Sequence, residues 1–176
     1  AQAIWKVAIP APADHPYLVR KGVEPTCTLR ELDVQQAVQI LGYQLQAKGV
    51  PLQGRLLVAP IMRAGLLSTV ELIDEHGHKA ALHGRGTKAG GYWATDRLPE
   101  TVMNVVICEG VADAITIRMA DAELAVAAFS DSNLVKVAQE MRRLFPGAVL
   151  TIVADLVKNS GHPDPRAIAA AKATNG

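Results

Sequence analysis

The sequence predicts an α/β protein of two parts, which we expect to meet near residue 96. Aromatic residues make up only 4% of the chain although 49% of it is hydrophobic, so Ala, Val, Ile and Leu must form the core. Residues 97–176 alternate apolar runs with helical patterns, which is typical of a parallel sheet covered by helices on both faces. Residues 1–96 instead combine one helical pattern with short strands and turns, which indicates a smaller α+β segment.

The first part begins with an irregular segment. Its prolines exclude a long helix over residues 1–27. The capping-box spacing from Thr28 to Glu31 then predicts a helix over about 29–48, which Gly49 and Pro51 end. After this helix we expect an antiparallel meander, with strands at 56–62, 67–73, 79–82 and 91–93.

The second part repeats the order strand then helix three times after Pro99. The strands are expected at 102–108, 124–129 and 148–154, and the helices at 111–119, 132–144 and from Asp164 onward. Asp164-Pro165 is a typical helix start, with Asp as the N-cap and Pro at the first helical position. These runs therefore predict a parallel sheet with flanking helices.

Glu109 and Asp155 are candidate metal ligands, because they follow the first and third of these strands. In open α/β sheets ligands bind beyond the carboxyl ends of strands, where the winding direction reverses, and in the common 2-1-3 order the two carboxylates meet there. Mg²⁺ is usually held by one or two carboxylates together with waters and substrate phosphates. Gly110 keeps the backbone clear beside them. Acids also follow strands as solvated caps, so the pattern alone leaves both roles open.

Two short motifs contain the candidate ligands Glu109 and Asp155. They are the run Val105-Val-Ile-Cys-Glu-Gly-Val-Ala-Asp113 and the later Leu150-Thr-Ile-Val-Ala-Asp155, and both resemble the Toprim domain of plasmid- and phage-type DNA primases. Further similar segments are Ala127–Leu134, Phe145–Ala148, Gly161–Pro163 and, upstream of the Toprim part, His15–Gly22, Gly54–Val58 and Gly84–Tyr92. The resemblance extends over nearly the whole chain and implies a Toprim-like sheet in residues 97–176.

The resemblance implies metal-dependent nucleotidyl transfer, in which primers are made from nucleoside triphosphates on a single-stranded DNA template. Glu109 would be the general acid/base or a metal ligand, and a DxD motif that begins at Asp155 would hold Mg²⁺ or Mn²⁺. Val157 occupies the second position of that motif, where an apolar side chain cannot bind a metal ion. A degenerate Toprim that only binds nucleic acid therefore stays open, and a Toprim nuclease is a third possibility.

Three further acids lie near the expected site. Asp131 follows the second strand and is a candidate metal ligand, although its neighbours also suit a helix cap. Asp113, one helical turn after Glu109, either orients a ligand or complements the positive end of the helix. Asp164 is better explained as an N-cap than as a substitute for the missing second Asp.

Residues 1–95 carry ten Lys/Arg and seven Asp/Glu, and this excess is where nucleic-acid contacts are expected. The candidates for phosphate contacts are Arg20, Lys21, Arg63, Arg85 and Lys88, with Tyr92 and Trp93 for base stacking. The glycine-rich segment 84–91 leads into an aromatic strand, so it is no dinucleotide fingerprint, and it lacks the ending of a P-loop. His76, His78 and His83 are interpreted as solvated turn residues, because no Cys or carboxylate set completes a zinc site.

Composition excludes several other classes of protein. The net charge of +1 gives no global basic field, and two cysteines can form neither a disulfide framework nor a four-ligand zinc site. No apolar stretch is long enough for a membrane span, which favours a cytoplasmic protein. The start at Ala1 suggests a fragment of a longer polypeptide, so helicase or zinc-binding modules are expected as partners in the same or a separate chain.

Overall fold

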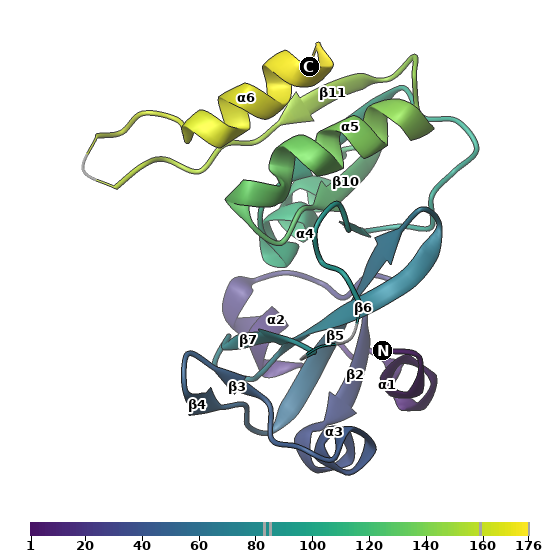
Figure 1. Ribbon diagram of the computed structural model, residues 1–176, viewed down its shortest axis with the longest axis vertical. Helices are drawn as coiled ribbons and strands as arrows, with labels where there is room; N and C mark the ends of the chain where they lie inside the picture. The colour runs from purple at the N-terminus through teal and green to yellow at the C-terminus, as the bar shows by residue number, and fades with distance from the viewer. Residues whose placement is uncertain (83, 85, 159, 176) are drawn as a thin grey trace. The chain divides into compact units, whose positions relative to one another are not determined.

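Figure 1 shows the computed structural model, which describes residues 1–82, 84, 86–158 and 160–175. The chain divides into two compact units, Ala1–Lys88 and Ala89–Gly176, each with its own main sheet. Among the described residues, no helix combines the length and the apolar character that a membrane span requires.

The first unit is built on an antiparallel sheet with the strand order β1-β2-β5-β6-β7. Its strands are β1 (Ile9–Pro10), β2 (Arg30–Asp33), β5 (Arg55–Arg63), β6 (Leu66–Ile73) and β7 (Lys79–Ala81), and β3 (Gln46–Ala47) pairs with β4 (Val50–Pro51). The hairpin of β5 and β6 turns at Ala64 and Gly65, where φ values of 47° and 76° are those of a type I′ turn. The predicted strands at 56–62, 67–73 and 79–82 are thus confirmed.

Short helices pack on this sheet and close its core. They are α1 (Gln2–Val7), α2 (Pro16–Lys21) and α3 (Val34–Leu41). Ile4 of α1 and Ala37 of α3 are fully buried together with Leu56, Val58 and Leu72 of the sheet. Burying one such aliphatic side chain contributes roughly 1.5–3 kcal/mol, so this cluster is what stabilises the unit.

The helix predicted over 29–48 is wrong. The segment forms β2 first, because Leu32 is buried against the core while the strand pairs with β5. The helix α3 begins only after Asp33, whose side chain accepts a hydrogen bond of 2.7 Å from the backbone N–H of Gln35, and it ends at Gly42 with φ of 76°. Glu31 is not part of a capping box: it accepts a hydrogen bond from Arg55.

Two other expectations for the first part also need correction. The segment 1–27 contains no long helix, as predicted, but it is not irregular throughout, since α1 and α2 lie within it. The strand expected at 91–93 is β8 (Trp93–Ala94), and it does not continue the meander. It pairs with β10 (Leu124–Ala127) of the second unit, where Trp93 is fully buried.

The second unit has a sheet with the strand order β11-β9-β10-β8, in which β9 pairs in parallel with both β10 and β11. The strands are β9 (Asn104–Cys108), β10 (Leu124–Ala127) and β11 (Val149–Ile152). The helices are α4 (Val111–Met119), α5 (Leu134–Leu144), which follows the 3₁₀ turn η1 (Asp131–Asn133), and α6 (Pro165–Thr174). The predicted 2-1-3 order is confirmed.

The helices of the second unit lie on both faces of the sheet. In Figure 1, α5 lies in front of the sheet and α4 behind it. The helix α4 packs on β9 and β10, while α5 and α6 pack on each other and on β11. This arrangement explains why the strands are apolar on both faces, as in β10, where every residue is buried.

The N-cap of α6 leads to our first prediction. Asp164 accepts a hydrogen bond of 2.7 Å from the backbone N–H of Arg166, and Pro165 occupies the first helical position. Replacing Asp164 with Ala removes this acceptor, so the free energy of unfolding should fall by about 1 kcal/mol in urea titrations. Asp164→Asn, which can still cap, is the matched control. A loss of metal binding in both variants, without any loss of stability in Asp164→Ala, would show instead that Asp164 is a ligand.

Candidate active site

The ends of three parallel strands define the candidate site. Ala127 at the end of β10 is in register with Cys108 at the end of β9, and Ile152 at the end of β11 is in register with Ile107. The pairing continues past the strands, because the N–H groups of Ala128 and Val153 donate to the carbonyls of Cys108 and Ile107 at 2.9 and 2.8 Å. The residues that follow the three strands therefore emerge at one edge of the sheet.

Glu109 and Asp155 both lie at this edge. Glu109 directly follows β9 and is half-buried, whereas Asp155 follows β11 and is exposed. The Cys108 thiol at the end of β9 is buried: burial, together with the negative charges of Asp113, Asp155 and Glu109, raises its pKa to about 12. All three carboxylates are thus close enough to act on the last residue of the central strand.

Gly110 leaves room for the carboxylate of Asp113. A Cβ atom on Gly110 would lie 2.1 Å from the Oδ2 atom of Asp113, which is far inside contact distance. Asp113 is in the first turn of α4 and folds back over the residue that follows Glu109. Its carboxylate therefore complements the helix N-terminus and also adds negative charge to the site.

Asp131 reaches the same edge from β10, but its carboxylate is already engaged. Its Oδ2 atom pairs with Nη1 of Arg166 in α6, and its Oδ1 atom accepts from the N–H of Ser132. The chain turns toward it at Phe129, which has a φ of 66° and donates its N–H to the carbonyl of Glu109 at 2.8 Å. A bulky residue in the left-handed region is strained, and such strain is concentrated at functional sites.

These acids form no preassembled metal centre. Across residues 1–82, 84, 86–158 and 160–175, no group of three or more His, Cys, Asp or Glu side chains is placed to hold a metal ion. Glu109 and Asp155 are nevertheless oxygen donors at one sheet edge, and Mg²⁺ needs only one or two carboxylates when waters and phosphates complete its shell. The donor set thus fits a hard divalent ion bound together with a phosphate substrate.

The expected phosphate contacts in the first unit differ in their surroundings. Lys21 and Arg63 are exposed at the ends of α2 and β5. Arg20 donates to the carbonyl of Glu75 at 2.5 Å, and its guanidinium lies 5.6 Å from the Tyr17 ring centroid. Lys88 forms an ion pair of 2.5 Å with the buried Glu71. Lys21 and Arg63 therefore keep the most accessible charges of these four.

Other sequence predictions at this end of the chain are not supported or lie outside the described residues. Tyr92 is only 1% exposed and Trp93 is fully buried, so neither ring is available to stack on a base. Arg85 and His83 are outside the part of the chain that the structure describes. Nδ1 of His78 donates to the carboxylate of Asp74 at 3.0 Å in the turn between β6 and β7. Its partner is a carboxylate of the same turn, which agrees with a structural role.

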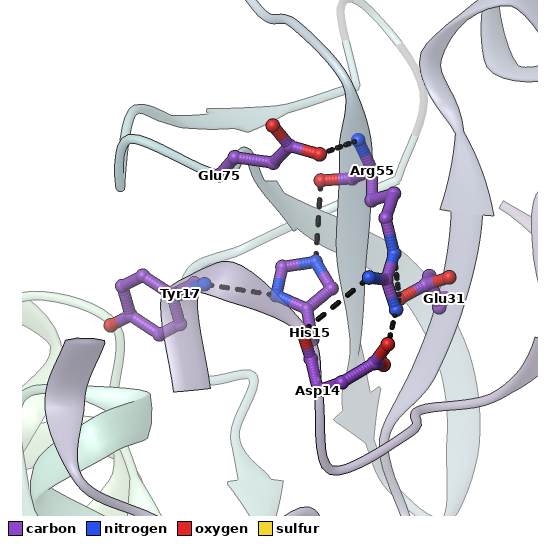
Figure 2. Close-up of polar contacts among 6 residues, drawn as sticks. All are labelled: Asp14, His15, Tyr17, Glu31, Arg55 and Glu75. Carbon is purple, nitrogen blue, oxygen red and sulfur yellow. Dashed lines mark hydrogen bonds and ion pairs between the residues drawn. The ribbon is translucent and has the colours of Figure 1, made fainter. Parts of the chain in front are cut away.

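The sequence did not indicate a polar cluster around Arg55 in the first unit, although two of its segments, His15–Gly22 and Gly54–Val58, carry the family resemblance. Figure 2 shows Arg55 at its centre, with the guanidinium bonded to Asp14 at 2.7 Å and to Glu31 at 2.8 Å. The N–H of Arg55 also donates to Glu75 at 3.0 Å. The two carboxylates raise the pKa of Arg55 and fix its side chain.

His15 joins α2 to this cluster. Its Nδ1 atom accepts a hydrogen bond from the N–H of Tyr17, which makes it the N-cap of α2, and its Nε2 atom lies 3.2 Å from the carbonyl of Arg55 (Figure 2). The side chain is fully buried, and burial lowers its pKa. The motif His15–Gly22 is therefore a capped helix, with Pro16 at its first position and Gly22 in the left-handed region at its end.

Comparisons with known proteins identify the fold. No family model matches the chain, and no curated protein is similar to it in sequence. Among solved structures, the primase fragment of the bacteriophage T7 primase-helicase protein is similar, with a TM-score of 0.53, 14% identity and 91% of this chain covered. The DnaG catalytic core is also similar, with a TM-score of 0.56, 12% identity and 98% of this chain covered.

A third similar structure is that of bacteriophage T7 lagging-strand DNA polymerase interacting with primase domains bound to an RNA/DNA hybrid and dTTP. It matches with a TM-score of 0.52 and 15% identity, and the match covers 90% of this chain and 71% of that chain. The chain spans about three fifths of the T7 primase fragment and of the DnaG core, at 59% and 61%. At these identities the likeness establishes a primase-type fold.

The buried His15 predicts a pH dependence of stability. The folded pKa of His15 is lowered, so the unfolded chain takes up a proton that the folded chain does not, and stability should fall as the pH drops below about 6.5. His15→Asn keeps a cap acceptor but cannot titrate. We expect urea titrations between pH 7.5 and 5 to show a smaller loss of stability in this variant than in the wild type. Equal losses would contradict the assignment.

Proposed function

We propose that this chain is the Toprim-containing catalytic part of a DNA primase of plasmid or phage type, which makes primers from nucleoside triphosphates on single-stranded DNA. The observation that carries the proposal is the parallel sheet order β11-β9-β10, with Glu109 directly after β9 and Asp155 three residues after the end of the adjacent β11. This is the edge at which open α/β sheets bind their ligands. The primase-type fold of the similar structures supports the same assignment.

In this proposal Glu109 and Asp155 hold Mg²⁺ or Mn²⁺, and Asp131 contributes once its carboxylate is released from Arg166. A bound divalent ion would neutralise charge on the attacking and leaving oxygens of the phosphoryl group. Glu109 is half-buried beside the end of β9, which suits it to accept the proton of the attacking hydroxyl. Asp155, exposed on the neighbouring strand end, faces solvent from which substrate phosphates arrive.

The first unit is proposed to guide the nucleic acid. Lys21 and Arg63 offer exposed cations for the phosphate backbone, with Arg20 and Lys88 available only if their present partners are exchanged. Such contacts would hold the template without reading its sequence. One similar structure comes from a primase-helicase protein, so helicase modules in the same or another polypeptide are proposed partners, and zinc-binding modules are proposed with them. A cytoplasmic location is part of the same proposal.

A second candidate function rests on Val157. It occupies the second acidic position of the expected motif, and its side chain is 40% exposed in the loop after Asp155. An apolar side chain there weakens metal binding, which favours a degenerate Toprim that binds nucleic acid without catalysis. A Toprim nuclease would use the same acids, and only an assay for cleavage of primed and unprimed strands separates it from a primase.

Metal titration by calorimetry, followed by a primer-synthesis assay, tests the proposed function. Glu109→Gln and Asp155→Asn should each weaken Mn²⁺ binding on the order of tenfold or more and abolish primer synthesis, because each removes a carboxylate from the same ion. Asp121→Asn is the matched control: it alters an exposed acid that follows α4, at the opposite end of that helix from the site.

The outcomes separate the candidate functions. Saturable binding that either substitution at the sheet edge abolishes, with Asp121→Asn unchanged, would support the catalytic assignment. No binding at millimolar metal, with an intact fold by circular dichroism, would leave the non-catalytic nucleic-acid-binding module. Strand cleavage without primer synthesis would identify a nuclease.

A further inference from the structure

Arg166 lies at the same sheet edge as the candidate catalytic acids, and its position there is fixed from two sides. It is the second residue of α6, and the N–H of the preceding Asp164 donates to the carbonyl of Asp155 at 2.9 Å. Its guanidinium pairs with the carboxylate of Asp131, which follows β10. Because β9 lies between β11 and β10, Arg166 links the loops that follow the two strands flanking Glu109.

The ion pair between Arg166 and Asp131 is exchangeable. The two side chains are 58% and 35% exposed, and ion pairs in such surroundings contribute little to stability. A guanidinium has a planar set of donors that matches phosphate oxygens and binds them in bidentate fashion. A phosphate group that enters this edge can therefore replace the Asp131 carboxylate on Arg166 at a small cost.

Building on the proposed function, we infer that Arg166 binds the triphosphate of the incoming nucleotide and that Asp131 holds it in place until the nucleotide arrives. After the exchange both side chains still face a group of opposite charge: the triphosphate takes the place of the carboxylate on Arg166, and Asp131 becomes free for the cation that accompanies the triphosphate. Asp131 is then a ligand only in the nucleotide-bound state, which explains why no acidic cluster is preformed among the described residues.

A second arginine of the same unit shows what a purely local ion pair looks like. Arg143, in the last turn of α5, pairs with Glu140 of the same helix at 2.8 Å, and its side chain is 62% exposed. It matches Arg166 in exposure and in the kind of partner. It differs in place, because α5 begins at the carboxyl edge of the sheet and its last turn lies at the other end. Arg143→Ala is therefore a matched control.

The test is the binding of inorganic tripolyphosphate to the full chain, measured by calorimetry in EDTA so that no metal takes part. Arg166→Ala should weaken binding about tenfold, the effect expected from one charge-assisted bidentate contact. Arg166→Lys should recover part of it, and Arg143→Ala should bind like the wild type. Asp131→Asn should strengthen binding, because it releases Arg166 from its partner. A merely structural ion pair predicts no gain in this variant.

The double variant Asp131→Asn with Arg166→Ala tests whether the tighter tripolyphosphate binding expected for Asp131→Asn depends on Arg166. The inference requires that it bind as weakly as Arg166→Ala alone. If Asp131→Asn strengthens binding by the same factor in the presence and absence of Arg166, only the general loss of negative charge is at work and the inference is overturned. Equal binding by wild type and Arg166→Ala, or no binding by the wild type, also overturns it.

The same variants distinguish this inference from the proposed function. In primer synthesis with Mg²⁺ or Mn²⁺, Arg166→Ala should raise the KM for nucleoside triphosphate about tenfold with a smaller effect on kcat, as expected for a lost ground-state contact. Tripolyphosphate binding that depends on Arg166, in a wild-type chain that makes no primer, would support the phosphate site and contradict primer synthesis. Thermal melting of each variant verifies that the fold is intact.

Discussion

The parallel pairing of β9 with β10 on one side and with β11 on the other is the interaction on which the candidate site depends. Its register aligns the carboxyl ends of all three strands, so residues distant in sequence, namely Glu109, Asp131 and Asp155, leave the sheet at the same edge. A slip of one residue in either pairing would turn the inward side chains of that strand to the other face. Every residue of the short strand β10 is buried, and Leu124 and Val126 alternate with alanines, so a slip would place each side chain in a space filled by one of another size.

Several carboxylates surround this edge of the sheet. Asp113 folds over Gly110 at the start of α4, and Asp131 is neutralised by Arg166. The carboxylates of Glu109 and Asp155 are those that a divalent cation would bind in the proposed site. In the first unit, His15 is buried and hydrogen-bonded through both ring nitrogens, and the Arg55 guanidinium pairs with two carboxylates. These contacts have a structural role, because they join the start of α2 to the sheet.

The sequence predicted correctly those strands, helices and caps that depend mainly on residues close to each other in the chain. The apolar runs of the second unit and the cap at Asp164 act over a few positions, and both are confirmed. The helix expected over 29–48 failed because strand pairing with β5 overrode the local pattern. The burial of Tyr92, the left-handed Phe129 and the ion pair of Arg166 arise from contacts between distant segments, so no pattern of spacing could have revealed them.

The most direct test of the central claim is paramagnetic broadening of backbone amide signals by Mn²⁺ in the ¹⁵N-labelled chain, whose mass of 18.7 kDa suits solution NMR. If the three strand ends form one metal-binding edge, substoichiometric Mn²⁺ should broaden the amides of Glu109, Gly110 and Asp155 first, followed by those near Asp131. Broadening centred on the turn of His76 and His78, or spread evenly over the exposed acids of both units, would contradict the account.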